Sequence, residues 1–168
     1  MLGVRTDLTA VAAVVLTLVS SQTWARTAAA VIQVSATVAP LCTIVVDELS
    51  FGEYDPFVAN ADAALDASAV VSVTCTKGLA SAVRLDAGAH GGAGNVRHLA
   101  SGGQRLAYWI FKDQARTAAW RTGQDGMSLP DVSTGQCPQS VALFGRIPPG
   151  QVVPSGAYTD TVMATLDF

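Results

Sequence analysis

The sequence has little charge and no excess of basic residues. Only 14% of its 168 residues are charged, and 10 Lys and Arg against 13 Asp and Glu give a formal net charge of −3. Proteins that bind nucleic acid carry a basic patch that contacts the phosphates. The composition therefore argues against nucleic acid as a partner. Half of the residues are apolar, which is enough to form the core of one domain.

The sequence also lacks the motifs of common catalytic sites. The patterns G-x-S-x-G, H-E-x-x-H and the P-loop are absent. Asp86, Asp113 and Asp125 lie beside predicted turns, where aspartate bonds the local backbone, and no spacing of carboxylates favours a glycosidase. His90 and His98 lie in a glycine-rich stretch, without enough further ligands for a metal site, and are expected to be solvated. We therefore expect no enzyme, no metal and no cofactor.

Long apolar runs are absent, and the one notable run lies near the N-terminus. Residues 10–19 are apolar apart from one threonine and follow Arg5; spanning a bilayer takes about 20 residues. This pattern predicts a signal peptide over residues 1–25, cleaved after Ala25 or, alternatively, after Ala30. The other alternative is an uncleaved anchor. The mature chain is expected to begin near Arg26 and to reach the periplasm or the outside.

Cysteine is scarce, with three residues in the chain. Export makes disulfides possible. Cys42 and Cys75 each lie in a strand-like run, whereas Cys137 lies in a turn-rich stretch, so we predict a bond between Cys42 and Cys75. A closed loop of about 34 residues stabilises a fold by roughly 3–4 kcal/mol. Cys137 is left as a free thiol, an intermolecular partner, or a half-buried residue without a role.

No segment after the predicted signal peptide shows a sustained helical pattern. Short alternating runs separated by turn residues predict a β-sandwich or barrel instead. One run is aromatic and places Tyr108 and Ile110 on one face and Trp109 and Phe111 on the other; core packing of at least one face is favoured over sugar binding. The glycine-rich stretch 87–104 is predicted to be a mobile, exposed loop. The predicted strands cover residues 30–38, 42–46, 49–54, 66–76, 80–88, 105–113, 118–123, 140–147 and 157–168.

The two ends of the mature chain are unusual for such a fold. The C-terminal run reads as a core strand, and the sequence stops at Phe168 with no turn or closing strand after it. At the N-terminus, the run 30–38 predicts one strand more than is expected for such a fold. The pattern predicts that one end lacks an edge strand while the other offers one. The C-terminal run places Tyr158, Val162, Ala164, Leu166 and Phe168 on one face, with Asp160 as the exception.

Six stretches, spread over nearly all of the mature chain, carry a family resemblance: "VSATVAPLCTI", "LSFGEYDP", "VSVTCTKG", "LAYWIFKDQARTAAW", "LFGRIPPGQ" and "PSGAYTDTVMATLDF". In these stretches the chain resembles the spore coat protein U domain family, which includes subunits of archaic, Csu-type chaperone–usher pili. The resemblance implies an all-β, incomplete immunoglobulin-like sandwich that lacks its last strand and is completed by donor-strand complementation. It also implies that a periplasmic chaperone lends the strand first, and that the N-terminal extension of the next subunit replaces it after passage to an outer-membrane usher.

The resemblance implies a donor extension over residues 26–38 and a pilin domain over residues 39–168. It makes the chain a structural pilus subunit on the cell surface that supports attachment or biofilm formation, with other pilin subunits as partners. The alternative is a surface-binding module, either an adhesin or a coat-layer protein. Cys42 and Cys75 match the family's two-cysteine pattern, and Cys137 departs from it. The expected donor side chains are Ile32, Val34, Ala36 and Val38, and the expected acceptor groove is lined by Val162, Ala164, Leu166 and Phe168.

For residues 30–38 a second interpretation stays open. In this interpretation, residues 30–38 form an ordinary first strand within their own sheet, or a tail that a monomer folds back into its own groove.

Overall fold

The computed structural model describes residues 26–123, 126–129 and 138–168. The predicted signal peptide, Asp125 and Cys137 lie outside this part of the chain. The chain divides after Ala36 into an N-terminal segment and a compact unit, Thr37–Phe168. Residues 26–36 are exposed and form no strand. In the described ranges, no helix has the length and apolar character needed to cross a membrane.

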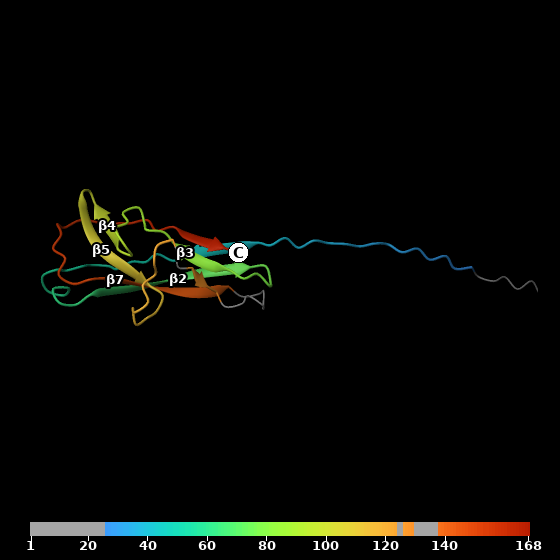
Figure 1. Ribbon diagram of the computed structural model, residues 1–168, viewed down its shortest axis with the longest axis horizontal. Coiled ribbons are helices and arrows are strands. Elements are labelled where there is room, and N and C mark those ends of the chain that lie inside the picture. The colour runs from blue at the N-terminus through green and yellow to red at the C-terminus, as the bar shows by residue number, and fades with distance from the viewer. Residues whose placement is uncertain (1–25, 124–125, 130–137) are drawn as a thin grey trace, which may run out of the picture. The chain divides into compact units, whose positions relative to one another are not determined.

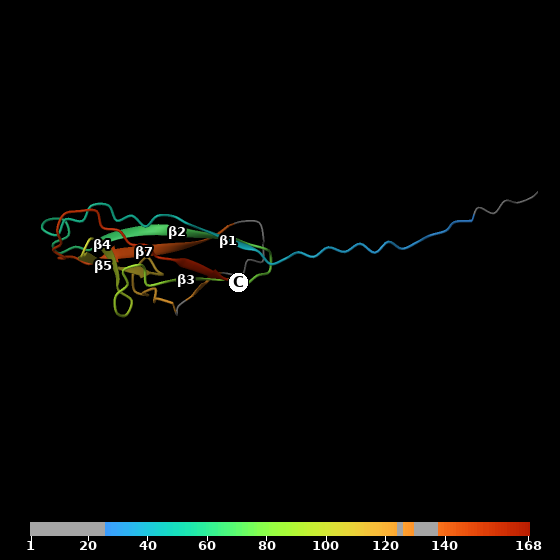
Figure 2. The same cartoon turned by 90° about the horizontal axis from the view of Figure 1, so that it is seen from above.

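The compact unit is built from antiparallel strands in two sheets (Figures 1 and 2). The larger sheet has the order β1-β2-β7-β5-β4 and the smaller has the order β6-β3-β8. The described residues contain no helix, so the predicted all-β class is confirmed. The strands are β1 (Cys42–Val46), β2 (Leu65–Cys75), β3 (Ala82–Leu85), β4 (Arg97–Ser101), β5 (Gln104–Phe111), β6 (Met127–Ser128), β7 (Gln139–Ile147) and β8 (Ala164–Asp167).

The core lies on the inner face of the larger sheet. β2 and β7 pair from Leu65↔Ile147 to Val73↔Gln139, and every second residue is buried along the central part of each strand. This is the period-2 burial expected for a sheet with one face in the core. On β5, Tyr108 and Ile110 are buried, which confirms that one aromatic face packs in the core.

The disulfide between Cys42 and Cys75 is confirmed. These residues are direct partners in the register of β1 and β2, and their Cα atoms lie 4.0 Å apart. The bond therefore fastens β1, an edge strand, to the larger sheet at the end of β2.

Two sequence predictions are corrected by the structure. Residues 87–104 are not one exposed loop, because they contain β4, on which Arg97 is fully buried. The two histidines are not simply solvated: the His90 ring Nδ1 lies 3.2 Å from the Asp160 carboxylate, and the His98 ring Nδ1 lies 3.1 Å from the His90 carbonyl.

Residues 30–38, also expected to be a strand, form none in this structure. Two further stretches that were expected to be strands have another conformation. Residues 49–54 form no strand, although Leu49 and Phe51 pack against the core. Residues 118–123 contribute one isolated bridge, between Phe111 and Ala119. In both stretches the apolar side chains reach the core without a continuous ladder beside them.

The disulfide gives a direct stability prediction. The double change Cys42→Ser and Cys75→Ser should lower the free energy of unfolding by about 3 kcal/mol, because the unfolded chain regains the entropy that the closed loop removes. Denaturant titration of the mature chain measures this loss. Cys137→Ser is the control and should leave the free energy of unfolding nearly unchanged; a larger loss from the control would mean that Cys137 carries the stabilising bond.

Candidate functional site

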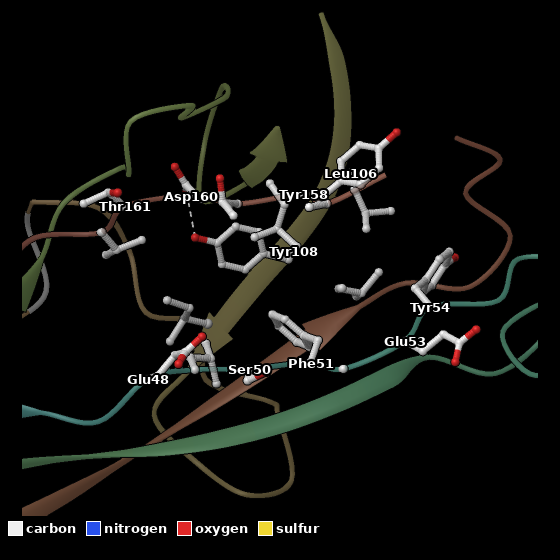
Figure 3. A pocket seen from close by; sticks show the side chains of 18 of the residues that line it. Glu48, Ser50, Phe51, Glu53, Tyr54, Leu106, Tyr108, Tyr158, Asp160 and Thr161 are labelled. Carbon is white, nitrogen blue, oxygen red and sulfur yellow. Dashed lines mark hydrogen bonds between the residues drawn. The ribbon is translucent and has the colours of Figure 1, made fainter. Parts of the chain in front are cut away.

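A groove with a cavity of about 870 Å³ opens over the inner face of the larger sheet. Its floor is apolar and comes mainly from β5 and β7, with contributions from β4 and from β3 of the smaller sheet. One wall is the segment 46–57, which begins at the last residue of β1, and the other is the segment 153–164, which ends at the first residue of β8. Figure 3 shows the two walls on either side of Tyr108. The floor side chains are Leu85, Leu99, Leu106, Tyr108, Ile110, Leu143 and Ile147.

The wall 153–164 is paired on one edge only. Thr159 exchanges two backbone hydrogen bonds with Ala100, of 2.8 and 3.0 Å, and the carbonyls of Thr161 and Met163 accept further backbone N–H groups. Successive residues of an extended chain direct their backbone groups to opposite edges. The backbone groups of Tyr158, Asp160 and Val162 therefore face the groove, and they have no backbone partner among the described residues.

The opposite wall, residues 46–57, makes few backbone hydrogen bonds on either edge. The Asp47 N–H donates to the Val70 carbonyl at 2.9 Å, and from residue 48 to residue 54 the described structure contains no backbone–backbone hydrogen bond. Side chains hold this wall instead. The Phe51 ring packs edge-on against the Tyr108 ring with centroids 5.9 Å apart, and the Tyr54 hydroxyl donates to the Pro148 carbonyl at 2.8 Å.

Gly145 of β7 makes room for this wall. A Cβ atom at residue 145 would lie 2.7 Å from the Phe51 ring and 3.0 Å from the Leu49 side chain. Cβ atoms essentially never approach a neighbour at 2.7 Å, so any larger residue would force Phe51 to shift, and glycine avoids this where the wall crosses the sheet. The groove consequently has an apolar floor and two walls with free backbone groups, which are the features that an added strand occupies.

The groove's charges are acidic. Asp47, Glu48 and Glu53 are exposed along one wall, and no lysine, arginine, histidine or cysteine is among the described residues that line the groove. The described residues also contain no cluster of His, Cys, Asp and Glu that suits a metal ion.

One carboxylate is buried in the groove wall. The Asp160 side chain is 1% exposed; the Tyr108 hydroxyl donates to its Oδ2 at 2.8 Å, and the His90 backbone N–H donates to its Oδ1 at 3.2 Å. The His90 ring Nδ1 lies 3.2 Å from the same Oδ1. Burial, together with this hydrogen bond to Asp160, raises the pKa of the Tyr108 hydroxyl well above its ordinary value. Tyr108 therefore stays protonated and acts as a donor.

A buried guanidinium lies close to this carboxylate. Arg97 is fully buried, and its Nε and Nη2 donate to the Asp86 carbonyl at 3.0 and 2.7 Å. Its Nη1 donates to the Trp120 carbonyl at 3.3 Å. Burial lowers the pKa of Arg97, whereas the nearby Asp86 and Asp160 charges raise it. The Arg97 side chain is thus held by the backbone carbonyls of Asp86 and Trp120.

The residues predicted for the acceptor groove divide into two pairs. Val162 and Ala164 line the groove, whereas Leu166 and Phe168 are not among its described lining residues. Leu166 packs against the core from β8, and Phe168 is 58% exposed. The predicted donor residues Ile32, Val34, Ala36 and Val38 are all exposed.

Sequence reasoning missed the wall 46–57 and the buried network around Asp160. The sequence does indicate that the wall is extended, because Leu49 and Phe51 alternate with non-hydrophobic residues. Alternation does not reveal, however, that an extended segment lacks a neighbouring strand. The signal for the network was Asp160 itself, the one polar residue on an apolar face of the C-terminal run.

Comparisons with known proteins place these features in context. The family model described as Spore Coat Protein U domain matches residues 28–165. A curated relative, "Protein U" of Myxococcus xanthus, is 33% identical over 179 residues, which cover 99% of either chain. A similar solved structure is a chaperone–tip adhesion subunit pre-assembly complex, CsuC–CsuE, from archaic chaperone–usher Csu pili of Acinetobacter baumannii.

The similarity to the solved structure has a TM-score of 0.56 and 25% identity, and it covers 79% of this chain. This chain spans only 40% of the solved chain. With the open groove, the comparison confirms the predicted fold class, an incomplete immunoglobulin-like sandwich that lacks its last strand.

The crossing at Gly145 gives a stability prediction. Gly145→Ala should lower the free energy of unfolding by about 1–3 kcal/mol, because the new methyl group displaces Phe51 and Leu49 of the wall 46–57 from their packed positions. Thermal or denaturant unfolding measures the loss. Gly103→Ala is the matched control, since a Cβ atom at residue 103 meets nothing within 4 Å. Equal losses from the two changes would contradict the role assigned to Gly145.

Proposed function

The chain belongs to the Spore Coat Protein U domain family, and from this membership we propose that it is a secreted structural subunit of a chaperone–usher pilus, polymerised by donor-strand exchange. The observation that carries the proposal is the groove, in which an apolar floor lies between two walls with unpaired backbone groups. Such an edge is prone to uncontrolled pairing when it is left open. An inserted strand satisfies the backbone and covers the floor at once.

The proposed donor is the segment 26–38 of another copy or of a related subunit. Ile32, Val34 and Val38 are each at least 79% exposed, and with Ala36 they lie on one face of an alternating run. Burial of four such side chains at about 1–2 kcal/mol each gives several kcal/mol, to which the backbone ladder adds. Identical subunits joined head to tail in this way do not close into a ring and form a fibre.

The route to the fibre follows from the same groove. In our proposal the signal peptide directs the chain to the periplasm, where a chaperone strand fills the groove until the usher brings the next subunit. The similar solved structure is a complex of a chaperone with a pilus tip subunit before assembly, which supports a chaperone as the first occupant. The finished protein lies in a surface pilus that promotes attachment or biofilm formation, and its role is structural, without enzyme activity.

A second candidate function is that of a surface-binding module, an adhesin or a coat-layer protein that forms no shaft. Phe57 and Val58 favour it, because they are 72% and 81% exposed on a loop fixed by hydrogen bonds from their N–H groups to the Asp55 carboxylate, of 2.9 and 3.1 Å. Exposed apolar residues on a rigid loop are typical of interaction surfaces. A binding screen of the monomer against glycans and abiotic surfaces distinguishes this candidate.

Removal of the donor segment tests the polymer directly. The mature chain without residues 26–38, expressed with its chaperone, should still form the chaperone complex, because the groove is intact. It should fail to donate to a second subunit. Size-exclusion chromatography and electron microscopy of the assembled material measure both properties. Assembly of the truncated chain as efficient as that of the intact chain would refute the donor assignment.

A single substitution makes the same test without shortening the chain. Val34→Asp places a charge on the face that enters the groove and should reduce polymer formation at least tenfold, since burial of an unpaired charge costs several kcal/mol. Ser35→Asp is the matched control, because its side chain lies on the opposite face of the donor. The two variants should differ in polymer yield on a sedimentation assay; the same yield from both would contradict the proposed orientation.

A further inference from the structure

We propose that Asp160 is a positioning residue of the groove. Its buried carboxylate holds residues 158–163 of the wall 153–164 in the register that presents free backbone groups to an incoming strand. This inference rests on the proposed function and extends it to a residue that the apolar pattern of the strand does not explain. Asp160 is the polar exception among inward-facing neighbours: Tyr158, Val162 and Ala164 pack against the core.

The carboxylate is held from two directions. From the floor, the Tyr108 hydroxyl of β5 donates to Oδ2 at 2.8 Å, as the dashed line in Figure 3 shows. From the side, the His90 backbone N–H donates to Oδ1 at 3.2 Å, and the His90 ring Nδ1 lies 3.2 Å from that oxygen. The wall is thus tied to the larger sheet and to the loop between β3 and β4 at one point.

The backbone near Asp160 is shaped for this contact. A Cβ atom at residue 88 would lie 2.3 Å from the Asp160 Oδ2, and Gly88 has a φ of 78°. Both the close approach and the left-handed conformation require glycine. The Asp86 carboxylate accepts the Gly88 N–H and the Met163 N–H, each at 2.9 Å. Two carboxylates therefore fix the wall, at residue 160 and at residue 163.

The charge explains why an apolar side chain does not serve at this position. A slip of one residue in an extended chain moves every inward side chain outward, so the inward Tyr158, Val162 and Ala164 already disfavour it. A slip of two residues keeps the same face inward, and Val or Leu at residue 160 would allow it at modest cost, because the other inward side chains are apolar too. A buried carboxylate that loses its donors is strongly disfavoured, so Asp160 restricts the wall to one register.

A fixed wall lowers the cost of adding a strand. Ordering a flexible segment during binding consumes part of the binding free energy, and preorganisation avoids that cost. With Asp160 in place, the backbone groups of Tyr158, Asp160 and Val162 already face the groove. Asp160 should therefore affect the affinity for a donor strand more than a surface aspartate does.

The experiment measures binding of a labelled peptide of residues 26–38 to the mature chain by fluorescence anisotropy. Every protein carries Val34→Asp, so that its own extension does not compete. Asp160→Asn replaces one acceptor oxygen by a donor and should weaken peptide binding about tenfold or more, the effect of losing hydrogen bonds to a charged group. Amide hydrogen exchange at Thr159 and Met163, whose N–H groups donate to the Ala100 carbonyl and the Asp86 carboxylate, should become faster in the same variant.

The matched control is Asp113→Asn. Asp113 also accepts backbone N–H groups, from Thr117 at 3.1 Å and from Ala118 at 2.7 Å, but it lies in a turn and does not line the groove. It should lose some stability without losing peptide affinity. Gly88→Ala should act like Asp160→Asn, since its methyl group displaces the Asp160 carboxylate.

The outcomes separate this inference from the proposed function. A parent chain that binds no peptide overturns the proposed function and the inference with it. A parent chain that binds, together with an Asp160→Asn variant that is folded and binds equally well, overturns the inference alone. If Asp160→Asn does not fold, Tyr108→Phe decides: weaker peptide binding supports the role of the carboxylate, and unchanged binding contradicts it.

Discussion

The rest of the structure depends on one constraint, the unpaired backbone along two edges that face each other over an apolar floor. Backbone N–H and C=O groups beside buried apolar surface need partners. The walls 46–57 and 153–164 are held by side chains and by their outer edges, and their inner edges have no backbone partner among the described residues. In the proposed function, a strand from another molecule fills this position of the incomplete sandwich.

Several features fix the positions of the two walls. The disulfide between Cys42 and Cys75 fastens the strand that leads into one wall. Gly145 lets that wall lie close to the sheet, while Asp160 and Asp86 hold the other wall from its buried side and its outer edge. Each of these features acts on a wall and not on the floor. In the proposed function, walls that are already in position reduce the cost of ordering the groove when a strand binds.

The sequence predicted the features that depend on local alternation. Strands β2, β5 and β7 follow period-2 patterns of apolar residues, and the Cys42–Cys75 pairing followed from two strand-like runs. Alternation does not say whether a strand finds a partner, so residues 49–54 were expected to be a strand and instead form a wall. Glycine density in residues 87–104 concealed β4, whose Arg97 is buried because distant backbone carbonyls receive it. Contacts of that range have no local signal.

In the proposed function an added strand pairs with the inner edge of the wall 153–164. Amide hydrogen exchange, measured with and without the bound peptide of residues 26–38, detects this pairing residue by residue. We expect new protection at Tyr158, Asp160 and Val162, in alternation with little change at Thr159, whose N–H already donates to the Ala100 carbonyl at 3.0 Å. Bound peptide with no added protection at these three amides would mean that the added strand does not pair with this edge.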